Sequence, residues 1–220
     1  MRPIRGIILD VDGTFIDSND AHAKSWTEAM AEYGYQVSFE KVCPMIGMGG
    51  DKVLPQTIHL QKDSEIGSQM SKRREAIFKE RYLPRLRAFP GAKELLQEMR
   101  KRGLKLALAS SAQPDERKSL LRLVGAEVLV EEKTSSKDVS RSKPDPDVMG
   151  VALQGTGLDA HEVLMIGYTA YDIEAARKAH VGTTAFHCSG WKDADLAGAL
   201  VIHDGPADLL AHYDESPLTG

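Results

Sequence analysis

The chain has 220 residues, of which 42% are hydrophobic and 27% charged, so it can bury a sizeable core, either as one large domain or as a core with a smaller insertion. Its formal net charge of -4 argues against a nucleic-acid-binding protein, which usually carries a basic face. Its two cysteines form no disulfide or zinc pattern, and no apolar stretch reaches the length of a membrane helix, so we expect a cytoplasmic protein without nucleic-acid or membrane partners.

The first predicted element is a strand. Residues 4–9 form a short apolar run rich in isoleucine, and acidic residues and Gly13 follow it. This pattern is typical of a buried parallel strand whose carboxyl end opens into a loop.

The next segment, residues 17–87, is predicted to be an all-helical inserted domain. Amphipathic patterns at 21–33 and 64–82 indicate two helices with shorter helical pieces between them, and no convincing strand occurs. A helical insertion directly after the first strand is expected over the carboxyl edge of the sheet, where ligands bind in open α/β folds.

From residue 88 onwards, short apolar runs alternate with helical patterns. The runs predict strands at 104–109, 127–130, 163–166, 183–186 and 200–202. The patterns between them predict helices at 92–101, 114–124, 146–154, 170–179 and 206–212. We therefore predict an α/β fold in which residues 1–16 and 88–220 form a core domain with a doubly wound parallel sheet, and residues 17–87 form the helical domain.

The strongest chemical signal is the segment Asp10-Val11-Asp12-Gly13-Thr14 at the end of the first predicted strand. Its two carboxylates leave the strand on the same side and diverge as the loop turns, so that one can act as a nucleophile while the other transfers protons. Gly13 lets backbone N–H groups approach an anion closely. The alternative is an acidic turn that only caps the strand.

Polar residues also stand where later strands end and helices begin. Ser110 could donate to a phosphate oxygen, although Ser110 or Ser111 suits a plain helix cap equally well. Lys143, in a stiff loop with two prolines, could neutralise a carboxylate and a phosphate together, or could be a solvated surface lysine. Asp172 falls in the first turn of the predicted helix 170–179, where an acid is also common for structural reasons.

These four segments, in this order, resemble those of the haloacid dehalogenase superfamily. The resemblance spans essentially the whole chain and indicates the branch of small phosphatases and beta-phosphoglucomutase-like enzymes with a helical cap. It implies a magnesium-dependent hydrolase of small phosphomonoesters, in which Asp10 becomes an aspartyl phosphate while Asp12 protonates the leaving oxygen and then activates water. Asp12 also argues against a true dehalogenase, which needs no acid to expel halide.

The same resemblance assigns the binding residues. Phosphate would be held by Ser110, Lys143, Gly13 and Ser111, and Mg²⁺ by Asp10, Asp12 and Asp172. In the cap, Gly49 and Lys52 could contact substrate, or could simply begin an exposed helix. The expected partner is a small phosphorylated metabolite.

One position departs from the family pattern. The fourth segment usually reads Gly-Asp-x-x-x-Asp, and here Tyr168 stands at the first acidic position, which commonly supplies a direct metal ligand. A neutral phenol is a poor ligand for Mg²⁺. One possibility is that Asp172, or a water that it holds, completes the metal site. The other is that the metal site is lost and the chain is a catalytically impaired or noncatalytic relative. A sugar-phosphate mutase is a further alternative.

Overall fold

The computed structural model describes residues 3–110, 114–130 and 141–219. The chain divides into two compact units, one formed by Met1–Asp17 with Arg87–Gly220 and the other by Ser18–Leu86. Among the described residues, no helix combines the length and the apolar character needed to cross a membrane.

The first unit is built on a five-stranded sheet in the order β2-β1-β3-β4-β5, in which all paired strands are parallel. The strands are β1 (Gly6–Leu9), β2 (Lys105–Leu108), β3 (Val163–Gly167), β4 (Gly182–Phe186) and β5 (Val201–His203). Every residue of β1 and β3 is buried, as expected for central strands that are covered on both faces. The carboxyl ends of β2, β1 and β3 therefore lie next to one another at one edge.

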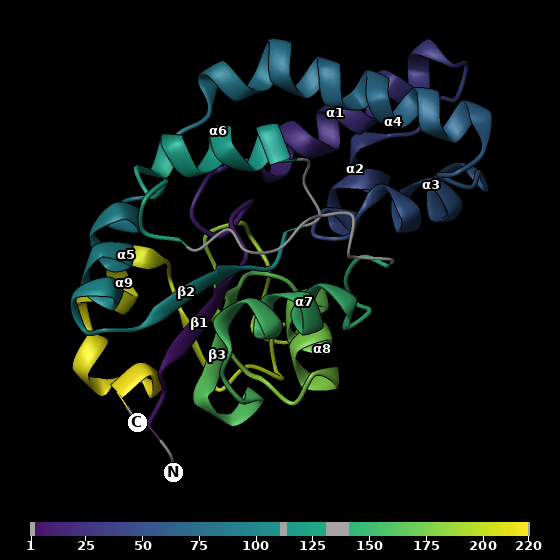
Figure 1. The fold of residues 1–220 in the computed structure, drawn as a ribbon. Helices are drawn as coiled ribbons and strands as arrows, with labels where there is room; N and C mark the ends of the chain where they lie inside the picture. Colours follow the sequence, from purple (N-terminus) through teal and green to yellow (C-terminus); the bar gives the residue numbers. More distant parts are fainter. Residues whose placement is uncertain (1–2, 111–113, 131–140, 220) are drawn as a thin grey trace. The chain divides into compact units, whose positions relative to one another are not determined.

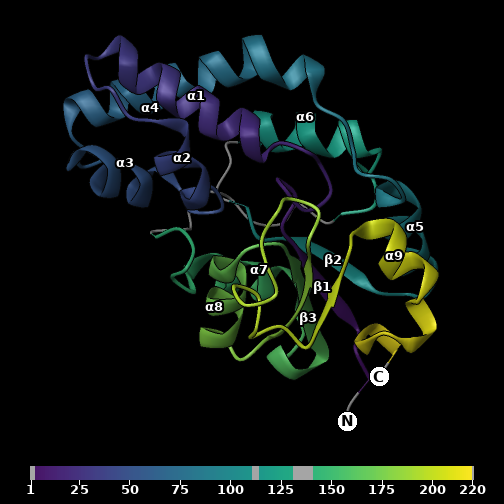
Figure 2. The same ribbon diagram turned by 180° about the vertical axis from the view of Figure 1, so that it is seen from behind.

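Helices cover both faces of this sheet, with α5 and α9 on one side and α7 and α8 on the other (Figures 1 and 2). The helices of this unit are α5 (Ala92–Lys101), α6 (Pro114–Val124), α7 (Asp147–Thr156), α8 (Ala170–Lys178) and α9 (Pro206–Ala211), with short 3₁₀ turns at Ala160–Glu162, Tyr213–Glu215 and Pro217–Thr219. On the second face, Ile8 and Met165 of the sheet share one apolar cluster with Met149 of α7 and Ala176 of α8. The prediction of a doubly wound α/β fold is confirmed.

One predicted strand, at 127–130, is wrong, because these residues form a turn. Gly125 ends α6 with φ +71°, and the amide of Ala126 donates to the carbonyl of Leu121, which is how a left-handed glycine closes a helix. The amide of Leu129 then donates to Ala126, and Val128 is 91% exposed. The apolar residues of this segment suggested a strand, but the turn at Gly125 after α6 determines the local structure instead.

The second unit is a helical insert, and within Ser18–Leu86, where every residue is described, the structure contains no strand. Its helices are α1 (Asn19–Glu32), α2 (Phe39–Val42), α3 (Gly50–Ile58) and α4 (Glu65–Ile77), with 3₁₀ turns at Cys43–Met45 and Leu83–Arg85 and a wider π-helical turn at Phe78–Tyr82.

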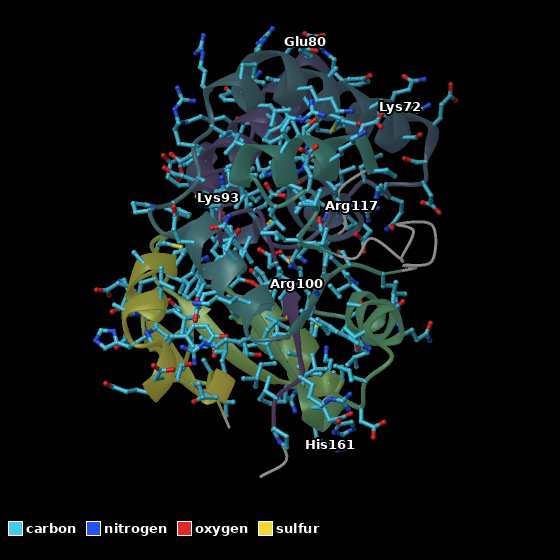
Figure 3. All side chains as sticks on the ribbon, turned by 60° about the vertical axis from the view of Figure 1, so that its left-hand side comes forward. Lys72, Glu80, Lys93, Arg100, Arg117 and His161 are labelled. Carbon is cyan, nitrogen blue, oxygen red and sulfur yellow. The ribbon has the colours of Figure 1, made fainter. Side chains whose placement is uncertain are left out.

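The helical insert has its own apolar core. Trp26 and Met30 of α1 pack with Leu54 of α3 and with Met70 and Ile77 of α4. The opposite side of α4 and of the π-helical turn that follows it is polar. Figure 3 shows the exposed side chains Lys72 and Glu80 of this side reaching outward. This amphipathic division is what the helical pattern at 64–82 predicted.

Candidate active site

The loop after β1 begins at the centre of the sheet. The amide of Asp10 donates to the carbonyl of Ile166 at 3.0 Å, and the amide of Ala109 donates to the carbonyl of Leu9 at 2.8 Å. These bonds extend the pairing of β1 with β3 and β2 by one residue. Asp10 and Ser110 consequently lie at the same edge, immediately past the carboxyl ends of neighbouring strands.

Asp10 is a buried carboxylate held by two side chains. Its Oδ1 accepts a hydrogen bond from Lys143 Nζ at 2.5 Å, and its Oδ2 accepts one from Thr14 Oγ1 at 2.9 Å. All three residues are at most 5% exposed. The two donors fix the orientation of the carboxylate and leave about two of its four lone pairs available.

Lys143 also binds the second carboxylate of this cluster. Its Nζ lies 2.7 Å from Asp172 Oδ1, so one ammonium group joins Asp10 to Asp172. The lysine and Asp172 are almost completely buried, and a buried charge is tolerated only when it is paired and hydrogen-bonded. Lys143 is therefore not a solvated surface lysine.

Asp172 is held from its other side by the start of α8. Its Oδ2 accepts three hydrogen bonds, from the amides of Tyr168 and Thr169 at 3.1 and 3.0 Å and from Thr169 Oγ1 at 2.8 Å. Thr169 Oγ1 in turn accepts a hydrogen bond from the Asp172 amide, which completes a capping box. Both oxygens of the Asp172 carboxylate are thereby engaged, Oδ1 by Lys143 and Oδ2 by the start of α8, and this residue positions Lys143.

The pKa values follow from burial and from this pairing. Burial raises the pKa of Asp10 to about 7, and the negative charge of Asp172 adds to the rise, while the ammonium of Lys143 opposes it. For Lys143, burial alone would lower the pKa, but the two carboxylates outweigh burial and raise it above its usual range. Lys143 is a permanent cation, and Asp10 changes charge near neutral pH.

Of the other residues predicted to hold phosphate, the structure describes Gly13 and Ser110. Ser110 lies half-buried at the shared edge, and Ser111 lies outside the described residues. Gly13 has φ +73°, a conformation that glycine adopts without strain. Its carbonyl accepts a hydrogen bond from Ser189 Oγ at 2.6 Å, which ties the loop to the segment after β4. Asp12, next to it, is half-buried.

The two residues predicted to contact substrate belong to the helical insert. Gly49 is the residue before α3, and Lys52 lies in the first turn of that helix, where its amide donates to the Gly49 carbonyl at 2.9 Å. Both are half-buried. Their contact with substrate stays a prediction.

Tyr168 is the largest fully buried side chain among the described residues, with 1% exposure. Its ring lies against the loop after β1: a Cβ atom added to Gly13 would be 2.3 Å from Tyr168 Cζ. The position that the sequence pattern reserves for an acid thus holds an aromatic ring packed on the backbone.

These contacts do not fit the magnesium site that the resemblance implies. Mg²⁺ requires close to octahedral coordination by oxygen ligands. Of the predicted metal ligands, Asp172 already binds Lys143 through Oδ1 and the start of α8 through Oδ2. At the position where the family pattern has a further acid, Tyr168 presents a phenol. Asp10 accepts one hydrogen bond on each carboxylate oxygen, so it keeps lone pairs beside the Lys143 ammonium.

The family of the chain follows from comparison with known sequences. The model of the haloacid dehalogenase-like hydrolase family matches residues 7–186. This chain belongs to that family. The matched stretch contains Asp10, Ser110, Lys143 and Asp172, so the resemblance seen in the motifs is confirmed at the level of the family.

Several relatives of this chain are phosphatases by name. The phosphoglycolate phosphatase of Yersinia pestis is 27% identical over 217 residues, which cover 96% of this chain and 91% of the relative. The pyrophosphatase PpaX of Oceanobacillus iheyensis is 27% identical over 182 residues, which cover 83% of each chain. A crystal structure of a hydrolase from Pseudomonas syringae has a TM-score of 0.86 at 29% identity and covers 96% of this chain and 98% of its own.

Three residues of this site in the haloacid dehalogenase-like hydrolase were not assigned from sequence. Thr14 stands within the first motif, and its spacing from Asp10 could have indicated a contact across the turn. Thr169 forms the pattern Thr-x-x-Asp with Asp172, which is a recognisable capping box. Ser189 gave no sequence signal, because only the packing of the loop after β4 brings it to Gly13.

Proposed function

We propose that this chain hydrolyses small phosphomonoesters through covalent transfer of the phosphoryl group to Asp10, acting in the cytoplasm. The observation that supports this most is the buried contact of Asp10 with Lys143, itself held by Asp172, at the carboxyl edge of the sheet. Membership of a hydrolase family whose named relatives include a phosphoglycolate phosphatase and a pyrophosphatase favours the same substrate class.

In the first step, a carboxylate oxygen of Asp10 forms a bond to phosphorus and the ester P–O bond breaks. Asp12 donates a proton to the leaving oxygen, which departs as an alcohol. Because phosphoryl transfer depends mainly on positioning and charge stabilisation, the Lys143 ammonium contributes by facing both the nucleophile and the incoming oxygens. Ser110 would donate to the same oxygens, whereas the amide of Gly13 would first have to leave the carbonyl of Ile16, to which it donates at 2.9 Å.

In the second step, Asp12 takes a proton from water, and the resulting hydroxide attacks the phosphorus of the aspartyl phosphate. The bond between Asp10 and phosphorus breaks, inorganic phosphate leaves, and the Asp10 carboxylate is restored. Gly49 and Lys52 of the helical insert would select the leaving group.

A turnover assay tests this proposal directly. Release of phosphate from an aryl phosphate and from a panel of small organic phosphates should depend on Asp10, so Asp10→Asn should abolish it. A phosphorylated intermediate should be trapped by rapid acid quenching of the wild-type chain and should be absent from Asp10→Asn. Turnover that survives in Asp10→Asn would contradict the proposal, whereas an isomerised sugar phosphate without released phosphate would identify a mutase.

A noncatalytic, phosphate-binding protein is the second candidate, and Tyr168 is the observation that favours it. In that case the chain would bind orthophosphate without turning over any ester. Calorimetric titration with orthophosphate, combined with the turnover assay, separates the two functions, because binding without any turnover would leave only the second.

A further inference from the structure

The ring of Tyr168 fills the space in front of the loop after β1. Tyr168 follows β3, which is the direct neighbour of β1, and its side chain runs towards Gly13. Three ring atoms, Cζ, Cε1 and Cε2, would lie within 2.3–2.7 Å of a Cβ on Gly13. The far end of the phenol therefore sits directly over this glycine.

Asp172, in the first turn of α8, does not replace the missing acid. A metal bound to Asp172 would have to share Oδ1 with the Lys143 ammonium or break the hydrogen bonds that Oδ2 accepts at the start of α8, because both oxygens are already engaged. Asp172 is also 0% exposed. Its position suits it to hold a lysine.

We infer that this chain does not hold a catalytic magnesium ion at the end of β1 and β3, because Tyr168 occupies the ligand position with an apolar ring. Lys143 is then the cation that contacts Asp10, and hydrolysis by the wild-type chain is independent of Mg²⁺. The inference deepens the proposed function and rests on it for the location of the site. Its test measures metal binding directly, so a failed turnover assay and a failed metal titration are separate outcomes.

A matched set of substitutions at Tyr168 tests the inference. Tyr168→Asp places a carboxylate at the end of β3, directed at the same loop, and removes the ring that fills the space. Tyr168→Asn removes the same ring and has nearly the same shape as Asp but no charge. Tyr168→Phe keeps the ring and removes only the hydroxyl.

Mg²⁺ binding is measured by calorimetry on each folded chain, and Mn²⁺ binding by electron paramagnetic resonance gives an independent readout. Loss of a residue that only supports a metal ligand costs about 10–100-fold in affinity, so gain of a direct carboxylate ligand should reach about 100-fold. We expect Tyr168→Asp to bind about 100-fold more tightly than the wild-type chain, and Tyr168→Asn and Tyr168→Phe to remain as weak as the wild type.

Three results would overturn the inference, and the first two concern the wild-type chain. Tight Mg²⁺ binding by the wild-type chain that Tyr168→Phe abolishes would show that the phenol oxygen is a ligand, and tight binding that Tyr168→Phe keeps would show that other residues complete the site. Either result is obtained without Tyr168→Asp, so the inference remains testable if that variant does not fold. A folded Tyr168→Asp that binds no better than Tyr168→Asn would equally contradict it.

Discussion

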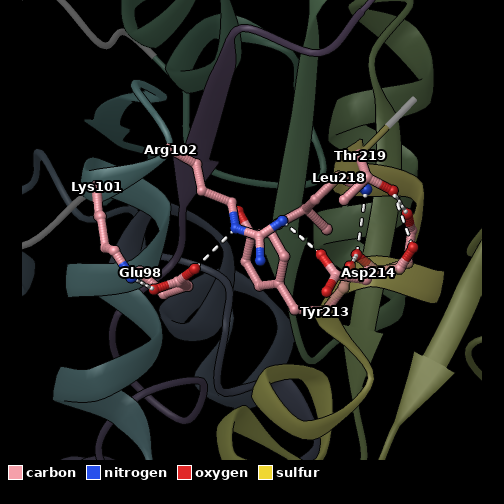
Figure 4. A network of polar contacts seen from close by, with 8 residues as sticks. Glu98, Lys101, Arg102, Tyr213, Asp214, Leu218 and Thr219 are labelled. Atoms are coloured by element: carbon pink, nitrogen blue, oxygen red, sulfur yellow. Dashed lines mark hydrogen bonds and ion pairs between the residues drawn. The ribbon is translucent and has the colours of Figure 1, made fainter.

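Two clusters in the core domain use the same arrangement, in which one cation joins two carboxylates, but they differ in burial. At the sheet edge, Lys143 joins Asp10 and Asp172, and its side chain is 4% exposed. On the surface, Arg102 joins Glu98 and Asp214 at 2.8 and 2.5 Å, and the Asp214 side chain is 78% exposed (Figure 4). The distances are similar, so the difference between the clusters lies in the solvent around them.

This comparison shows what burial adds to an ion pair. Water and salt screen the exposed Arg102 cluster, so its attraction contributes little to stability. In the buried cluster the charges have lost their hydration, so each depends on its partners, and removing one partner leaves an uncompensated charge. The buried cluster also has a titrating member, because burial raises the pKa of Asp10 to about 7.

The largest effect is expected for Lys143→Met, which removes the buried cation and leaves two carboxylates facing each other. Breaking a buried pair in this way costs about 3–5 kcal/mol in the free energy of unfolding. The loss should be greater at pH 8 than at pH 5, because at the lower pH Asp10 can take up a proton and become neutral. Urea unfolding at both pH values measures it. A loss that is equal at both pH values would contradict the buried charge of Asp10.

A second prediction concerns the pH dependence of turnover. Asp10 must be ionised to attack phosphorus, and its pKa is raised to about 7, so kcat should fall about tenfold for each pH unit below 7 and reach a plateau above it. The raised pKa also means that ionisation of Asp10 destabilises the folded state. The free energy of unfolding of the wild-type chain should therefore fall as the pH rises from about 4 to 7, between the unfolded and folded pKa values. A kcat profile that is flat between pH 5 and 7 would contradict it.

Asp172→Asn should have a smaller effect on stability. The amide oxygen can still accept the hydrogen bonds at the start of α8, but the pairing with Lys143 is lost, so we expect a cost of about 1–3 kcal/mol. Because the negative charge of Asp172 raises the pKa of Asp10, the acid limb of the kcat profile should move to lower pH. That shift distinguishes ionisation of Asp10 from ionisation of the substrate, which the substitution does not alter. An unmoved limb would show that Asp172 does not act on Asp10.

The smallest effect is expected for Arg102→Met in the exposed cluster, which serves as the control for Lys143→Met. The methionine keeps an apolar chain against Tyr213, whose ring centroid lies 4.4 Å from the guanidinium carbon. The midpoint of thermal unfolding should fall much less in Arg102→Met than in Lys143→Met. The small change in Arg102→Met should become smaller still at high salt. A loss as large as that of Lys143→Met would contradict the role assigned to burial.

Much of the core could be predicted from local pattern because its strands are short, continuous apolar runs and its helices have clear starts and stops. β3 and α8 fall within a residue or two of their predicted bounds for this reason. The segment 127–130 shows where local pattern fails to predict the structure. Its apolar residues have no strand partner among the described residues, and a glycine after α6 turns the chain instead.

The α/β alternation, the helical insertion and the order of the polar motifs depend on neighbours along the chain, so they can be predicted from the amino-acid sequence. Which charges meet depends on contacts between distant segments, so it follows only from the fold. Whether Asp172 serves a metal or a lysine depends on Lys143 reaching it from a different loop, across 29 residues of chain. Whether Tyr168 is tolerated depends on the absence of a side chain at Gly13, 155 residues earlier in the numbering (168 − 13 = 155), because only packing brings that backbone against its ring.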